Sequence, residues 1–219
     1  MNNINIDKKQ VLRFLGYGNR KPHEKIINML DEENEKAIAL IKPNFYSKVL
    51  KIESKENNKI TLKNGYILEG QEIYKQLKHC FFIAFNIATV GKEIEEAMRD
   101  YMAKRQTMKS LIYDKIGVVL LDYVVDENRN NLIENLKKDE LNITCEISPG
   151  EKDWNIENLN LIFEVLKNEN KSVKLNEYSM MEPIKSTAFI WGIGKGKAMA
   201  CGHRCSRCKN PCKFKEGNW

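Results

Sequence analysis

Four cysteines lie close together near the end of the sequence, in the stretch CGHRCSRCKNPCKF at residues 201–214. Cys201, Cys205, Cys208 and Cys212 follow the spacing C-x3-C-x2-C-x3-C. Thiolates at this density bind a tetrahedral zinc ion or hold an iron–sulfur cluster. Because a single short loop must supply all four sulfurs, the spacing favours a [4Fe–4S] cluster. Zinc is the alternative, and a tail without bound metal is the third interpretation.

The net charge of +6 is concentrated in the same segment. Residues 195–219 contain seven cations and one acid, whereas residues 1–194 balance 29 cations with 29 acids. Metal-bound thiolates would offset much of this local excess. A basic patch alone is weak support for nucleic-acid binding, so we expect no nucleic-acid partner.

The rest of the chain has the composition of a globular domain, with 42% hydrophobic and 30% charged residues. It has no apolar stretch long enough to span a membrane, and the start MNNINIDKKQ lacks the apolar core of a secretory signal. We therefore expect a cytoplasmic protein with no membrane partner. We divide it into a domain at residues 1–194 and a cysteine-rich tail at residues 195–219.

Hydrophobic periodicity and turn residues predict helices mixed with antiparallel strands, without regular βαβ alternation. This pattern indicates an α+β fold, with an antiparallel or mixed sheet and flanking helices. Helices are expected at residues 7–15, 22–36, 71–78, 92–105, 107–125, 126–138 and 155–168. Strands are expected at residues 48–53, 59–62, 66–68, 80–89, 143–147, 173–175 and 187–193.

Some cysteines and glycines of this domain have structural interpretations. Cys80 and Cys145 fall in apolar strands, so we expect both in the core. The glycines between Gly192 and Gly196 lack the spacing of a phosphate-binding loop and are predicted to form turns.

Two further segments read ISPGEKDW (147–154) and YSMMEPIKSTAFIWG (178–192). A Ser-Pro-Gly turn after a strand either exposes backbone N–H groups to a ligand or simply connects two elements. Together with residues 11–17 and 88–91, these segments resemble the activation domain of cobalamin-dependent methionine synthase. They are most similar to stand-alone bacterial relatives, which can end in a cysteine-rich tail. The resemblance covers most of residues 8–193.

The resemblance implies a function. Cobalamin-dependent methyltransferases are inactivated when Co(I) oxidises to Co(II), and the activation domain couples reduction of the cobalt to methyl transfer from S-adenosylmethionine. The implied partner is a methyltransferase or corrinoid protein that carries the cobalamin. Flavodoxin or ferredoxin are the implied electron donors, and a [4Fe–4S] tail would serve as an electron relay.

The resemblance also implies a methyl-donor site. Ser148, Pro149 and Gly150 would line its pocket, and Asp122 would contact the amino group of the donor. The arginine and tyrosine of the family pattern fall on Glu146 and Glu151. An arginine would pair with the donor's carboxylate, whereas a glutamate repels it. We assign no catalytic residue from the sequence.

These two glutamates lead to an alternative function. In it the chain is a non-enzymatic binding or assembly module, with a degenerate S-adenosylmethionine site and a zinc-stabilised tail. A small iron–sulfur electron-transfer protein is a further alternative.

Overall fold

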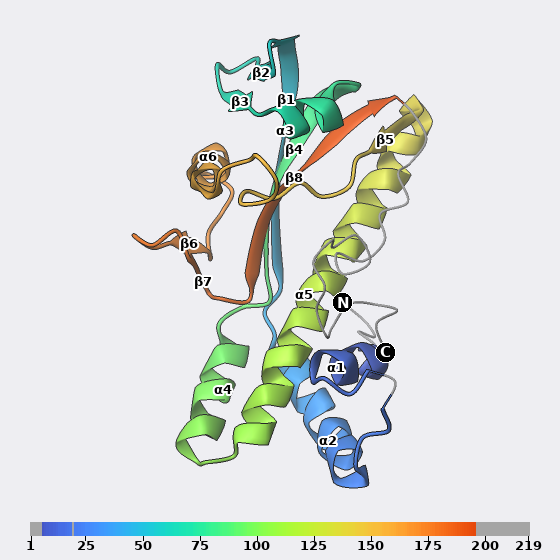
Figure 1. Cartoon of the computed structure of the whole chain (residues 1–219), viewed down its shortest axis with the longest axis vertical. Coiled ribbons are helices and arrows are strands. Elements are labelled where there is room, and N and C mark those ends of the chain that lie inside the picture. Colours follow the sequence, from blue (N-terminus) through green and yellow to red (C-terminus); the bar gives the residue numbers. More distant parts are fainter. Residues whose placement is uncertain (1–5, 19, 196–219) are drawn as a thin grey trace.

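The computed structural model describes residues 6–18 and 20–195, and this part of the chain has the expected α+β fold. An antiparallel sheet of six strands, in the order β3-β2-β1-β4-β8-β5, lies among the helices (Figure 1). The strands are β1 (Asn44–Glu56), β2 (Lys59–Leu62), β3 (Ile67–Glu69), β4 (Cys80–Thr89), β5 (Leu141–Ile143) and β8 (Ser186–Lys195). A separate hairpin consists of β6 (Lys174–Leu175) and β7 (Met181–Glu182).

The helices are α1 (Lys8–Phe14), α2 (Glu24–Leu40), α3 (Gln71–Leu77), α4 (Glu93–Ala103), α5 (Thr107–Leu136) and α6 (Leu159–Val165). The short 3-10 turn η1 (Lys137–Asp139) precedes β5, and a second one, η2 (Ile156–Asn158), precedes α6. Asp7 caps α1 as its position suggests, since its carboxylate accepts the Lys9 N–H at 2.9 Å. Helix α2 begins two residues later than Pro22, because His23 is its N-cap.

The strands β1, β2 and β3 form the antiparallel meander that the sequence predicts. At the Asn64-Gly65 turn, the Gly65 N–H donates to the Leu62 carbonyl at 2.8 Å. Gly65 has φ +87°, a conformation that glycine adopts at little cost.

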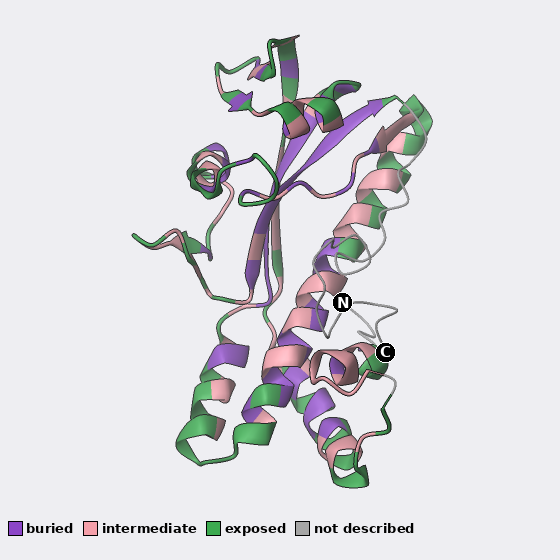
Figure 2. Ribbon diagram, in the orientation of Figure 1, coloured by how far each residue is buried: buried purple, intermediate pink, exposed green. Residues whose placement is uncertain are grey.

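Strands β4 and β8 separate two hydrophobic cores, and Figure 2 shows both strands as largely buried. Ala84, Ala88 and Trp191 contribute to a core with α1, α2, α4 and α5. Ile83 and Ile190 contribute to the second core, which includes residues of α3 and α6. Because side chains alternate along a strand, each of these strands supplies apolar groups to both cores. The apolar run predicted to be buried on both faces is therefore confirmed.

Glu33 of α2 is a fully buried charged residue next to the first core. It connects α2 with α4 and α5. Its carboxylate accepts hydrogen bonds from Lys109 Nζ (2.7 Å), Tyr101 Oη (2.6 Å), Tyr113 Oη (3.1 Å) and Lys36 Nζ (3.0 Å). Burial alone would raise the pKa of Glu33, but these four donors together lower it to about 2. The buried carboxylate is therefore ionised at neutral pH.

Three sequence-based expectations are corrected. The helices predicted at 107–125 and 126–138 are one continuous helix, α5, because no proline or glycine interrupts the polar stretch after Val125. The Asn128 side chain donates to the Val124 carbonyl at 2.8 Å instead of capping a new helix. The strand predicted at 143–147 ends at Ile143, and Ile147 forms only an isolated bridge with Ile190.

The third correction concerns glycines. Gly192 and Gly194 lie inside β8 and not in turns. A Cβ atom on Gly192 would collide with Leu77 and Cys80, and one on Gly194 would collide with the His79 backbone. Glycine is needed there for close packing. Cys80 and Cys145 are both buried, as expected.

Within the described residues, no helix combines the length and the apolar character needed to cross a membrane. Strand β8 ends at Lys195, next to the boundary proposed from the sequence. The tail with Cys201, Cys205, Cys208 and Cys212 lies outside the described residues.

Candidate functional site

The predicted methyl-donor turn follows the bridge between Ile147 and Ile190. Gly150 has φ +86°, and its N–H donates to the Trp154 carbonyl at 2.7 Å. The Glu151 N–H donates to the Ser148 carbonyl at 3.2 Å, and the Trp154 N–H donates to the Glu151 carbonyl at 3.1 Å. The N–H groups of Gly150 and Glu151 are therefore used inside the loop, and the Trp154 side chain at its end is buried.

The other predicted donor-site residues lie on two elements. Glu146 is half-buried and Glu151 is exposed, and both belong to the same loop as Ser148, Pro149 and Gly150. Asp122 lies half-buried in the middle of α5. Five of the six residues thus share one loop, and Glu146 and Glu151 place two carboxyl groups on it.

Lys185 joins the second family-like segment to the helices. Its Nζ donates to Asp114 Oδ1 at 2.6 Å, and its backbone N–H donates to Glu95 Oε1 at 3.1 Å. Its carbonyl accepts the Val90 N–H at 3.2 Å. The stem of Lys185 also lies against Gly117, where a Cβ atom would meet it at 3.3 Å. Lys185 therefore connects the end of β4 with α4 and α5.

The partner of this lysine is held as an anion. Asp114 also accepts a hydrogen bond from Lys115 Nζ at 2.6 Å. Burial would raise the pKa of Asp114, but the hydrogen bonds from Lys115 and Lys185 outweigh it and lower the pKa below its ordinary value. The Lys185 side chain is only 12% exposed, so solvent screens this pair weakly.

A cleft of about 610 Å³ lies beside this junction. Its walls come from the start of β1, the loop into α4, the first two turns of α4, the β6–β7 hairpin and the loop into β8. The lining residues are Lys42, Asn44, Gly91, Lys92, Glu93, Glu95, Arg99, Ser172, Lys174, Glu182, Pro183 and Ile184. The volume lies within the range of small-molecule sites, about 300–1,000 Å³.

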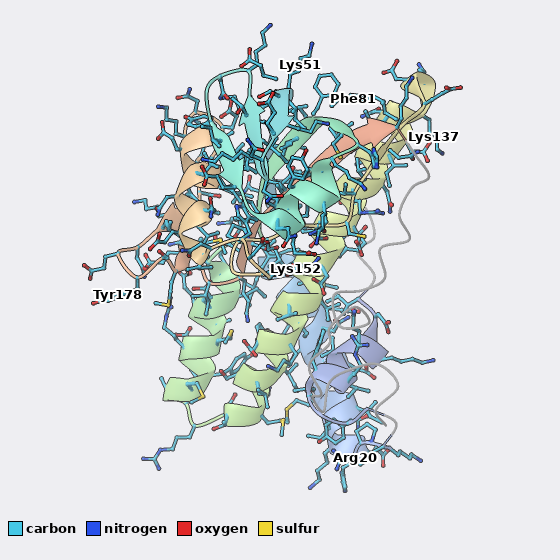
Figure 3. The ribbon with its side chains drawn as sticks, turned by 45° about the horizontal axis from the view of Figure 1, so that its top comes forward. Arg20, Lys51, Phe81, Lys137, Lys152 and Tyr178 are labelled. Atoms are coloured by element: carbon cyan, nitrogen blue, oxygen red, sulfur yellow. The ribbon has the colours of Figure 1, made fainter. Side chains whose placement is uncertain are left out.

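The β6–β7 hairpin beside the cleft carries exposed apolar side chains. Tyr178 is 74% exposed, and Figure 3 shows it projecting outward. Met180 and Ile184, on either side of β7, are 55% and 58% exposed. Apolar side chains that gather on a protein surface are typical of interaction sites.

Sequence reasoning missed this cleft. It drew attention to the segments at 88–91 and 178–192, and the structure brings parts of both to the cleft. It did not single out Glu95 or Arg99, because both occupy polar positions of an ordinary amphipathic helix. No local pattern distinguishes the buried Glu95 from the exposed Glu96 beside it.

The part of the chain that the structure describes contains no group of three or more His, Cys, Asp or Glu side chains that could hold a metal ion. A metal centre formed by the four tail cysteines remains a prediction.

Comparison with known proteins defines the fold. No family model matches the chain, and neither does any curated protein sequence. Among solved structures, the chain is similar to the MetH reactivation domain bound to AdoHcy, with a TM-score of 0.63. The match covers 84% of this chain and 73% of that chain at 11% sequence identity. The chain therefore has the fold of that reactivation domain, as the resemblance implied.

Proposed function

We propose that this protein reactivates a cobalamin-dependent methyltransferase or corrinoid protein whose cobalt has oxidised to Co(II). The observation that carries the proposal is the similarity of fold to the MetH reactivation domain over 84% of the chain. The segments that resemble the family in sequence also lie at the cleft and at the Ser148–Gly150 turn. The cobalamin would be carried by the partner.

The methyl donor that this family implies is S-adenosylmethionine, which supplies a methyl group that traps reduced cobalt. The residues at the Ser148–Gly150 turn do not fit its carboxylate. Gly150 and Glu151 use their N–H groups within the loop, and Glu146 and Glu151 place negative charge there. We therefore propose a reactivator that binds the Co(II) form of its partner and assists electron delivery, with no methyl-transfer step assigned to this turn.

A surface for the partner is available at the β6–β7 hairpin. We assign the contact to Tyr178, Met180 and Ile184, which are exposed and apolar. Replacing Tyr178 with serine should weaken partner binding at least tenfold, since an exposed aromatic anchor often contributes 2 kcal/mol or more, about 30-fold in affinity. Ile67→Ser in β3 is the control, because Ile67 is also a large hydrophobic residue at the surface and is 47% exposed.

The test uses the full chain and the corrinoid proteins of the same organism, each oxidised to Co(II). The rate at which the Co(II) absorption disappears is followed with a reductant, with and without the chain, and with and without S-adenosylmethionine. Acceleration by the chain supports the proposal, and a further gain from S-adenosylmethionine would show that methyl transfer takes part in the reaction. If no corrinoid protein is reduced faster, the proposal is wrong.

The tail can be tested separately. If Cys201, Cys205, Cys208 and Cys212 hold the [4Fe–4S] cluster that we propose, protein purified without oxygen contains about four irons and four sulfides per chain, with a colour that dithionite bleaches. One zinc per chain without colour supports the structural alternative. Flavodoxin and ferredoxin are the electron donors to compare once a cluster has been found.

A second function is favoured by Glu146 and Glu151. A module that has lost the methyl-donor site would bind its corrinoid partner without reactivating it. The reactivation assay separates the two, because such a module would bind the Co(II) partner without accelerating its reduction. Calorimetry tests the loss of the donor site itself, since micromolar affinity for S-adenosylmethionine would contradict it. The remaining alternative, an electron-transfer protein for other enzymes, predicts redox cycling without binding to any corrinoid protein.

A further inference from the structure

We propose that the cleft between α4 and the β6–β7 hairpin binds a small molecule with an α-amino-carboxylate group, with its ammonium on Glu95 and its carboxylate on Arg99. This inference is independent of the proposed function. It concerns a cleft whose lining differs from the Ser148–Gly150 turn. The turn pairs with β8 at Ile190, four residues and about 13 Å along the strand from Ser186.

Glu95 is the first half of the site. The residue is 8% exposed, so it is more than nine-tenths buried, yet it lines the cleft. One of its oxygens accepts the Lys185 backbone N–H at 3.1 Å. Its second oxygen accepts no hydrogen bond from the described residues, and it is not among the fully buried side-chain atoms that lack a partner. Because Glu95 lines the cleft, this oxygen can accept a hydrogen bond from a ligand ammonium group there.

Arg99 is the second half. The charged neighbours in the cleft are largely occupied, because Lys42 pairs with Glu93 at 2.7 Å and Lys92 pairs with Glu96 at 3.1 Å. Within residues 20–195, Arg99 forms no ion pair, and the same holds for Lys174 on the opposite wall. A guanidinium group binds a carboxylate with two parallel hydrogen bonds. Arg99 can therefore hold the acid group of a ligand, and Lys174 adds positive charge.

The spacing of Glu95 and Arg99 along the helix suits a ligand that carries its ammonium and carboxylate groups close together. Glu95 and Arg99 are four residues apart on α4, so they lie on one helix face with about 6 Å between their positions along the axis. One α-amino acid presents an ammonium and a carboxylate on the same carbon and can bridge them. Pro183 and Ile184 form an apolar part of the cleft wall, which suits an apolar side chain.

Two sources share this chemistry: a free amino acid with an apolar side chain, and a larger metabolite that carries the same group, such as S-adenosylhomocysteine. The cleft volume of about 610 Å³ accepts either by size. The experiment therefore titrates the full chain with L-methionine, L-leucine and S-adenosylhomocysteine. N-acetyl-L-methionine, which lacks the ammonium group, and L-methionine amide, which lacks the carboxylate, are the chemical controls.

Glu95→Gln is the decisive variant. The glutamine carbonyl oxygen can still accept the Lys185 N–H, so the fold is retained while the negative charge is lost. We expect at least tenfold weaker binding in Glu95→Gln and in Arg99→Gln, and no detectable binding of either chemical control. The exposed neighbours supply matched controls, Glu96→Gln and Lys104→Gln, which should bind like the unmodified chain.

The three titrations distinguish a free amino acid from a larger metabolite as the ligand. Binding of L-methionine or L-leucine that depends on Glu95 assigns the cleft to a free amino acid, and Glu95-dependent binding of S-adenosylhomocysteine alone assigns it to the larger metabolite. The proposal is overturned if none of the three binds at millimolar concentration, or if binding is unchanged in Glu95→Gln and Arg99→Gln. Neither result depends on a corrinoid partner, so this test and the reactivation test can fail separately.

Discussion

Replacing Glu33 with glutamine should destabilise the protein at neutral pH but much less at pH 3. The side chain is fully buried and accepts hydrogen bonds from two lysines and two tyrosines. Glutamine has nearly the same shape but no charge, so the substitution removes the ion pairs and leaves the packing in place. The helices α2, α4 and α5 lose the charged group that joins them.

The magnitude follows from the pKa of Glu33, which the fold lowers from 4.5 to about 2. A carboxylate with a lowered pKa stabilises the folded state above its unfolded pKa of 4.5, and this contribution is lost as the pH falls toward 2. The shift corresponds to about 3 kcal/mol at pH 7, of which about 2 kcal/mol is lost by pH 3. The Lys36 side chain is 58% exposed, so solvent screening makes about 3 kcal/mol an upper value.

The assay is urea unfolding of the unmodified chain and of Glu33→Gln, each at pH 7 and pH 3. Subtracting one protein's unfolding free energy from the other's at each pH cancels the contributions of the other titrating groups. We expect the difference in unfolding free energy to shrink by roughly 2 kcal/mol between the two pH values. Glu35→Gln, on the exposed side of the same helix, is the control and should show almost no difference. A difference for Glu33→Gln that does not change with pH would refute an ionised, paired Glu33.

Three further predictions concern packing and reactivity. Gly192→Ala should cost about 1–3 kcal/mol in unfolding free energy, because its methyl group would overlap Leu77 and Cys80; a neutral effect would contradict the close packing. Asp114→Asn should cost about 1–3 kcal/mol, and a double-mutant cycle with Lys185→Met should show coupling, whereas additive losses would contradict the pair. Burial raises the pKa of Cys80 to about 11, so peptide mapping should find Cys80 unlabelled by a thiol reagent in native protein at pH 8 and labelled in urea; rapid native labelling would contradict this.

Much of the fold could be predicted because its elements have clear local patterns. The apolar run of β4 and the Asn-Gly turn between β2 and β3 are examples. The single helix α5 could not be predicted, because the polar residues after Val125 are equally typical of a helix cap. Gly192 and Gly194 were misassigned because their close neighbours, Leu77 and Cys80 or His79, are more than 100 positions away in the sequence.

The candidate site is less accessible to sequence reasoning, since it depends on contacts between distant residues. Glu95 is distinguished from its acidic neighbours by a hydrogen bond from Lys185, which is 90 positions away. Lys185 is in turn oriented by Asp114, 71 positions away. At the Ser148–Gly150 turn, the sequence correctly indicates a tight turn, but it does not show that the loop itself uses the backbone donors.

The position of β8 between β4 and β5 has a consequence for how the protein is made. Strand β8 is the last described strand to be synthesised, and its residues complete both hydrophobic cores. Until it emerges from the ribosome, β4 has an unpaired edge and both apolar faces of the sheet lack a central strand. Neither hydrophobic core can therefore be completed before residues 186–195 have been synthesised, even though β1 to β4 can pair with one another earlier.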